Sequence, residues 1–111
     1  GKMGEKFTQQ VFEGNSKVEV KTERDIWKNT GNVAIELRCN GKPSGISTTE
    51  SSVWIHLLSY KGVIEGGFLF KVDELKGKIK KLHEKGDLKM VMGGDDNMSQ
   101  MALLPIKELF N

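Results

Sequence analysis

Residues 18–23, which read VEVKTE, set the local structure around which the rest of the chain is arranged. Successive side chains of a β-strand point to opposite faces, so this alternating run predicts a strand. Its two valines then share an apolar face, while Glu19, Lys21 and Glu23 share a charged one. Because the valines and the later strands supply an apolar side for a core, we expect the charged face to border a cleft.

The remainder of the first half predicts two helices and a second strand. Apolar residues at every fourth position predict a helix over residues 2–13. Residues 33–39 are apolar enough for a strand in the middle of a sheet. Residues 47–50, STTE, have the spacing of a capping box and predict a second helix, which Gly62 ends. The apolar stripe of this helix consists of Val53, Trp54, Leu57 and Leu58.

The second half predicts short strands and one basic helix. Residues 63–70 fit one bent strand or a hairpin, and further strands are expected at residues 87–92 and 101–104. Asp73 is expected to cap the basic helix. The inner face of this helix consists of Leu75, Ile79 and Leu82. Together these elements predict a single α/β domain over residues 1–111, with a mixed central sheet flanked by about three helices.

Composition narrows the class of protein. The chain has 111 residues, a net charge of +2 and a single cysteine, Cys39, so it cannot form an internal disulfide. Because it has no long apolar run and no signal-peptide pattern, we expect a soluble intracellular protein without membrane contact. The small net charge argues against a histone-like coat of positive charge. One segment nevertheless concentrates basic residues, namely Lys76, Lys78, Lys80, Lys81 and Lys85.

The Glu-Val-Lys block of the first strand has a pattern suited to metal-dependent phosphate chemistry. The carboxylate of Glu19 can hold a divalent cation that polarises a phosphate and activates a bound water. The ammonium of Lys21 faces the same way, where it can contact the phosphate or orient the water. Lysine and glutamate also alternate on many solvated strands, so the block alone does not select between the two interpretations.

Two further blocks join this one, residues 30–36 (TGNVAIE) and residues 41–46 (GKPSGI). With these blocks and the expected order of helix, strand, strand and helix, residues 1–60 resemble the PD-(D/E)XK nuclease superfamily. Within it, they are similar to small phage-type nucleases related to Holliday junction resolvases. The resemblance implies a restriction-endonuclease-like fold and a DNA endonuclease that requires Mg²⁺ or Mn²⁺. It also implies activity on branched DNA, a homodimer, and the host cytoplasm if the protein is phage-encoded.

The chain departs from the family pattern because no aspartate precedes Glu19. In the interpretation that we favour, Asn15 holds the aspartate position, four residues earlier on the same strand face. In a second, Glu5 supplies the other acid. In a third, Glu19 takes the role of the missing aspartate, and Glu36 and Arg38 on the next strand replace the Glu-x-Lys pair. The candidate catalytic residues are therefore Asn15, Glu19, Lys21 and Glu36, and the candidate metal ligands are Glu5, Asn15, Glu19 and Glu36.

Contacts with DNA phosphates are expected at two other places. In the turn over residues 40–46, the side chains of Lys42 and Ser44 can hold a phosphate together with backbone N–H groups opened by glycines. Lys78 and Lys81 belong to the basic segment and are candidate DNA contacts as well. An ordinary connecting turn and a solvated helix face are the alternative interpretations.

The two histidines and the cysteine are not among the candidate catalytic residues or metal ligands. His56 and His83 lack metal-ligand spacing and are expected in helices, and no histidine partner for Cys39 is placed by the sequence. The alternative function is a nucleic-acid-binding or interaction module that keeps the nuclease fold without cutting. The homodimer would use apolar residues of the second half, whose alternative role is core packing. These residues are Phe68, Phe70 and Met90.

Overall fold

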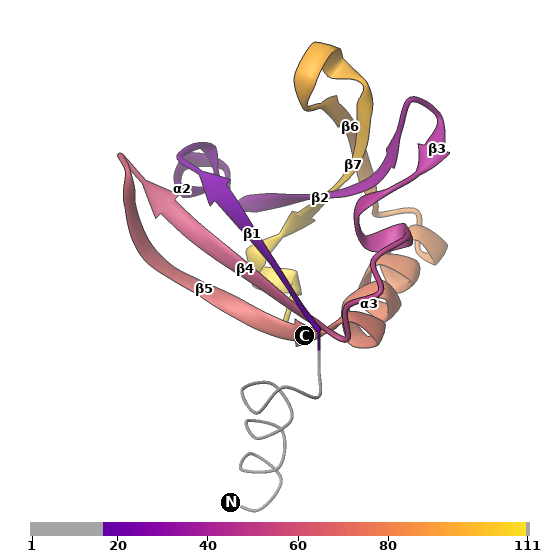
Figure 1. The fold of residues 1–111 in the computed structure, drawn as a ribbon, viewed down its shortest axis with the longest axis horizontal. Helices are drawn as coiled ribbons and strands as arrows, with labels where there is room; N and C mark the ends of the chain where they lie inside the picture. Colours follow the sequence, from indigo (N-terminus) through magenta and orange to yellow (C-terminus); the bar gives the residue numbers. More distant parts are fainter. Residues whose placement is uncertain (1–16, 111) are drawn as a thin grey trace, which may run out of the picture.

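The computed structural model describes residues 17–110, which form two β-sheets and one long helix (Figure 1). The helix expected over residues 2–13 lies outside the described residues, as do the candidate site residues Glu5 and Asn15. None of the helices in the described part is long and apolar enough to cross a membrane.

The first sheet contains three strands in the order β1-β4-β5. Strand β1 (Val18–Arg24) confirms the strand predicted from the alternating sequence. It runs parallel to β4 (Val53–Tyr60), which in turn runs antiparallel to β5 (Val63–Lys71). Strand β5 is one continuous strand, so the bent-strand prediction is confirmed and the hairpin alternative is wrong.

The second sheet is antiparallel and has four strands in the order β3-β2-β7-β6. Strand β2 (Asn32–Cys39) confirms the second predicted strand, and β7 (Ser99–Pro105) lies beside it in the middle of the sheet. The edges are β6 (Lys89–Gly93) and the two-residue β3 (Lys42–Pro43). The fold is therefore mixed α/β, but the expected single central sheet is wrong because the strands divide between two sheets.

Two α-helices occur within residues 17–110, whereas about three were expected over residues 1–111, one of them outside the described part. The short α2 (Ile26–Thr30) follows β1, and α3 (Val72–Glu84) is the predicted basic helix. The prediction that Asp73 caps α3 is wrong, since Lys71 is the N-cap residue and Asp73 lies in the first turn. An acid there still interacts favourably with the helix dipole. The described residues also contain three 3-10 turns: η1 (Gly45–Ser47), η2 (Asp95–Asn97) and η3 (Ile106–Glu108).

The helix predicted from residue 47 to Gly62 is wrong, because residues 53–60 form β4. The apolar residues fit a helical stripe, but Val53, Trp54 and Ile55 belong to the β-branched and aromatic types that favour strands. Strand β4 is also the central strand of its sheet. A strand in that position is apolar on both faces, and the two-residue period that identifies half-buried strands is then lost.

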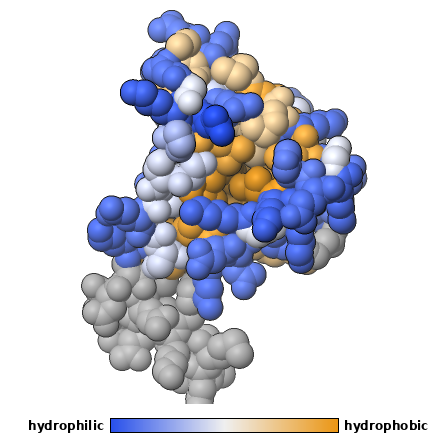
Figure 2. Space-filling view, turned by 90° about the vertical axis from the view of Figure 1, so that its right-hand side faces the viewer, coloured by the Kyte–Doolittle hydropathy of each residue, from blue (hydrophilic) through white to orange (hydrophobic). Residues whose placement is uncertain are grey.

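The hydrophobic core brings together residues of both sheets and α3. Its buried members are Val33, Ile35, Ile46, Trp54, Phe68, Val72, Leu75, Ile79, Ala102, Leu104 and Leu109. Phe68, which was expected at a dimer interface, is therefore a core residue, and Phe70 packs against this core. Met90 on β6 is exposed. Figure 2 shows the side of the molecule on which α3 and β3 lie, where apolar surface is bordered by hydrophilic side chains.

Candidate functional site

A cleft of about 520 Å³ opens between the two sheets. Strands β1 and β4 line it from the first sheet, and β2 and β7 line it from the second. Its titratable lining residues are Lys21, Glu23, Arg24, Glu36 and His56. Acidic and basic side chains thus share one concave surface, which is the usual setting of a binding or catalytic site.

The charged face of β1 borders this cleft, as the alternating sequence predicts. Lys21 and Glu23 line the cleft, while Glu19 lies on the same face of β1 beside Trp54 and is partly buried. The apolar face of β1 differs from expectation, because Val20 is 50% exposed. Within the described residues, the core of this sheet is therefore formed mainly by β4 and β5.

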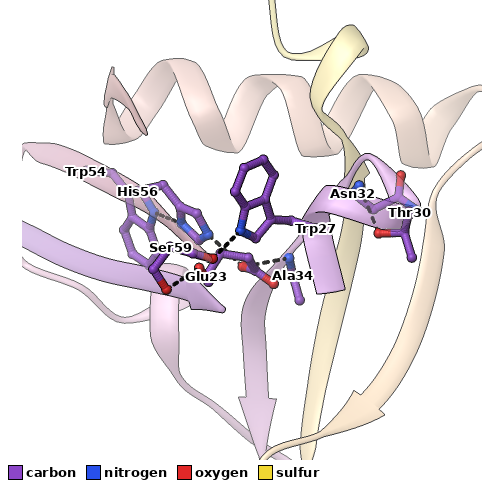
Figure 3. A network of polar contacts seen from close by, with 8 residues as sticks. All are labelled: Glu23, Trp27, Thr30, Asn32, Ala34, Trp54, His56 and Ser59. Carbon is purple, nitrogen blue, oxygen red and sulfur yellow. Dashed lines mark hydrogen bonds and ion pairs between the residues drawn. The ribbon is translucent and has the colours of Figure 1, made fainter. Parts of the chain in front are cut away.

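The carboxylate of Glu23 joins the two sheets (Figure 3). Its Oε1 lies 2.7 Å from Nε2 of His56, on the neighbouring strand β4. The same oxygen accepts a hydrogen bond of 3.2 Å from the backbone N–H of Ala34, on β2 of the other sheet. Ala34 stands opposite Leu103 of β7, but its N–H points away from β7 to this carboxylate. Glu23 thus accepts a hydrogen bond from a backbone N–H that does not take part in the pairing of β2 with β7.

His56 is buried behind this carboxylate. Only 2% of the residue is exposed, and its Nδ1 lies 3.1 Å from Nε1 of Trp54, a residue that is 1% exposed. The imidazole is stacked with the indole of Trp54 and with the ring of Phe68. Both ring nitrogens of His56 therefore have partners inside the protein, and His56 is a strand residue instead of the helix residue expected from the sequence.

Glu36 supplies the second carboxylate of the cleft. Its Oε1 accepts a hydrogen bond of 2.6 Å from the hydroxyl of Ser99, which lies on β7 of the same sheet. Two glycines approach this pair closely. A Cβ at Gly45 would clash with the backbone carbonyl of Glu36, and one at Gly94 would come within 2.8 Å of Ser99 Oγ. The GKPSGI block therefore supports Glu36 through the close approach of Gly45.

The end of β1 is tied to the end of β4 by a separate set of hydrogen bonds (Figure 3). The indole Nε1 of Trp27 donates to the backbone carbonyl of Ser59 at 2.6 Å, and the backbone N–H of Asp25 donates to the same carbonyl at 2.9 Å. The hydroxyl of Ser59 donates to the backbone carbonyl of Glu23 at 3.2 Å. The backbone that carries Glu23 is thus held independently of its side chain.

The predicted DNA contacts lie elsewhere on the molecule. Lys42 is exposed on the edge strand β3. The hydroxyl oxygen of Ser44 is buried and has no hydrogen-bond partner in residues 17–110, so it is not presented to a phosphate at the surface. Lys78 and Lys81 line a second hollow of about 200 Å³, between α3 and the end of β7 with the segment that follows it. The two lysines do not line the first cleft.

The described residues do not complete a metal site of three ligands. Across residues 17–110, no group of three His, Cys, Asp or Glu side chains is arranged to hold a metal ion. Of the predicted ligands, Glu36 lines the cleft and Glu19 lies on the adjoining strand face. His83 is exposed on α3 and Cys39 is partly buried on β2, and neither residue lines the cleft.

Sequence reasoning missed three residues of the site. Glu23 shares the charged face of β1 with Glu19 and Lys21, so the alternation contained the signal for it. His56 would have been found if residues 53–60 had been interpreted as a strand, because Trp54, His56 and Leu58 then share one face. Ser99 gave no local signal, since its pairing with Glu36 joins residues 63 positions apart.

Comparison of the chain with models of protein families, with curated proteins and with solved structures finds no match. The resemblance to PD-(D/E)XK nucleases therefore stays a prediction. A functional assignment has to be argued from the chemistry of the cleft, and in particular from the residues that its two walls bring together.

Proposed function

We propose that the chain is a divalent-cation-dependent DNA endonuclease whose site is the cleft between the two sheets. The observation that carries the proposal is the meeting of Lys21 with two carboxylates, Glu23 and Glu36, from different sheets. A restriction-endonuclease-like architecture and a cytoplasmic location belong to the same proposal. So does a preference for branched DNA, which the sequence resemblance suggests.

The donor set fits a hard cation such as Mg²⁺. Glu23 and Glu36 each use Oε1 for a protein hydrogen bond, and neither Oε2 has a partner within residues 17–110. Mg²⁺ prefers oxygen ligands, keeps several waters, and is commonly held by one or two carboxylates together with substrate phosphates. When bound, Mg²⁺ would supply a polarised phosphate and a water that is more readily deprotonated. Glu23 and Glu36 would hold it, with Glu19 as a further acid on the same face of β1.

The basic residues of the cleft would bind the DNA phosphate. Lys21 and Arg24 both line the cleft and are exposed, so their cationic groups can attract a DNA phosphate toward the two carboxylates. Lys21 lies two residues from Glu23 on one face of β1, which places its ammonium where it can contact the phosphate or orient a water. Lys42, Lys78 and Lys81 would then contact the DNA backbone farther from the reacting bond.

A cleavage assay tests the proposal. Branched and linear DNA are incubated with the chain and with its Lys21→Ala variant, each with Mg²⁺ or Mn²⁺, and calorimetry measures Mn²⁺ binding. Lys21→Ala should reduce cleavage roughly 100-fold, the lower range for loss of a general acid–base group, while Mn²⁺ affinity stays unchanged. Lys80→Ala, on the exposed face of α3, is the control for loss of one positive charge.

If the chain as given is inactive, the assay is repeated in the Asn15→Asp background, which would restore the aspartate of the family pattern. Undiminished cleavage by the Lys21 variant would exclude this site. Failure of both backgrounds to cut any DNA would exclude the endonuclease and leave the alternative, a nucleic-acid-binding module without catalysis.

The homodimer that the resemblance implies would use a surface on β6. This edge strand exposes Met90, Val91 and Met92, whose exposed fractions range from 37% to 58%. An unpaired edge with apolar side chains can pair with a second copy. Sedimentation at micromolar concentration, with and without branched DNA, should give twice the chain mass, and Met92→Lys should reduce that mass. A monomer under both conditions would contradict the dimer.

A further inference from the structure

We propose that His56 is a positioning residue, held as a neutral imidazole with its proton on Nε2, and that it fixes the Glu23 carboxylate in the cleft. Trp54 keeps Nδ1 unprotonated, and the carboxylate of Glu23, which can only accept, keeps the proton on Nε2. The expected effect on DNA cleavage rests on the proposed function. The effect on cation affinity rests on the cation site of that proposal. The tautomer does not, because it can be measured without DNA or a cation.

Hydrogen-bond capacity determines the tautomer. The indole Nε1–H of Trp54 can only donate, so Nδ1 of His56, 3.1 Å away, must accept and cannot carry a proton. A neutral imidazole then carries its proton on Nε2, which lies 2.7 Å from Oε1 of Glu23. The two distances are consistent with one chain of donors that runs from Trp54 through His56 to Glu23.

Packing and hydrogen bonding together disfavour a flip of the imidazole ring. The ring centroids of His56 and Phe68 are 5.3 Å apart with an interplanar angle of 7°, and those of His56 and Trp54 are 6.5 Å apart with an angle of 13°. A flipped ring would exchange the positions of its nitrogen and carbon atoms and would break both hydrogen bonds. A buried ring with 2% exposure has no water to replace them.

The consequence for Glu23 is a fixed orientation with its charge left available. Oε1 is held by two donors, His56 Nε2–H and the backbone N–H of Ala34, while Oε2 has no partner in the described part of the chain. Because the imidazole is neutral, it orients the carboxylate without neutralising it. Partners of this kind orient metal-binding carboxylates and histidines and raise their affinity for the cation.

The first experiment reads the tautomer directly by nitrogen NMR of the full chain with labelled histidine rings. The chain has only two histidines, so a His83→Asn variant assigns the spectrum. The unaltered protein should show His56 with a protonated Nε2 and an unprotonated Nδ1. Trp54→Phe removes the indole donor, so the Nδ1 resonance of His56 should shift as its hydrogen bond is lost, while Nε2 stays protonated because the Glu23 carboxylate can only accept. A protonated Nδ1 in the unaltered protein, or no change in Trp54→Phe, would overturn the proposal.

The second experiment uses two matched variants at His56. The amide nitrogen of glutamine can occupy the place of Nε2 and donate to Glu23, whereas that of asparagine reaches only the place of Nδ1. His56→Gln should keep its Mn²⁺ affinity within about threefold of the unaltered protein, and His56→Asn should lose roughly 10-fold, the lower range for an outer-shell partner. Equal affinity of both variants with the unaltered protein would overturn the positioning role.

The two proposals fail in distinguishable ways. If none of the proteins cuts DNA but the tautomer and the Mn²⁺ affinities follow the expected pattern, the endonuclease is excluded and the positioning role of His56 stands. If DNA is cut equally by the His56→Asn and His56→Gln variants, the positioning role is excluded and the endonuclease stands. If neither variant folds, the tautomer measured in the unaltered protein and in Trp54→Phe decides the matter.

Discussion

Glu23 and Glu36 face one cleft from different sheets, yet the protein holds them in different ways. Glu23 accepts hydrogen bonds from a buried imidazole of its own sheet and from a backbone N–H of the other sheet. Glu36 accepts one from the hydroxyl of Ser99, a group that can rotate and that belongs to its own sheet. Glu23 is therefore part of the structure that joins the sheets, whereas Glu36 is the more adjustable of the two.

This difference allows the contribution of each acid to stability to be distinguished from its contribution to cation binding. A carboxylate that pairs buried donors contributes to stability whatever else it does, because its removal leaves those donors without partners. A carboxylate with one rotatable partner contributes little to stability, so a strong effect of its substitution on cation binding would indicate function. The two acids can thus be compared by the same pair of substitutions.

The largest expected effect is on stability, from alanine at the two positions. Glu23→Ala leaves the Nε2–H of His56 and the N–H of Ala34 unpaired, and it should lower the free energy of unfolding by about 3 kcal/mol, since each such donor costs about 1–3 kcal/mol. Glu36→Ala should cost about 1 kcal/mol, because only one donor, the Ser99 hydroxyl, loses its acceptor. Urea unfolding followed by tryptophan fluorescence measures both. Equal losses would show that the two carboxylates are not held differently.

The next effect is on cation binding, from glutamine at the same positions. An amide oxygen still accepts the same hydrogen bonds but carries no charge. Glu23→Gln and Glu36→Gln should therefore each weaken Mn²⁺ binding at least about 10-fold, the smallest loss expected for an outer-shell partner, while unfolding changes by less than about 1 kcal/mol. Calorimetry and urea unfolding test the pair. Glu19→Gln tests whether the third acid of β1 belongs to the site, and indifference at all three positions would exclude a cation in this cleft.

The smallest effect concerns the partner of Glu36. Ser99→Ala removes one hydrogen bond and should lower the free energy of unfolding by about 1 kcal/mol. It should weaken Mn²⁺ binding less than Glu36→Gln does, because the carboxylate stays in place with its charge. A loss as large as that of Glu36→Gln would mean that Glu36 is positioned as strictly as Glu23. Chemical unfolding and calorimetry on one preparation of Ser99→Ala provide the comparison.

The elements that the sequence predicted correctly are those with a strong local period. The alternation of VEVKTE predicted β1, and the apolar run at residues 33–39 predicted β2. The spacing of Leu75, Ile79 and Leu82 predicted α3, and the structure confirms all three elements. The central strand β4 was missed, because it is apolar on both faces and the spacing of its apolar residues also fits the stripe of an amphipathic helix. Since His56 lies on that strand, the error in β4 also hid His56 as a residue of the candidate site.

What the sequence determined by itself is the charged face of β1. Alternation is a property of the strand backbone, so Glu19, Lys21 and Glu23 must share a face wherever the strand lies. Only the tertiary structure decided what that face meets. Glu23 contacts His56, 33 residues away, and Glu36 contacts Ser99, 63 residues away. Contacts over such separations depend on the register of neighbouring strands and on the packing of one sheet against another, and no local pattern encodes either of these.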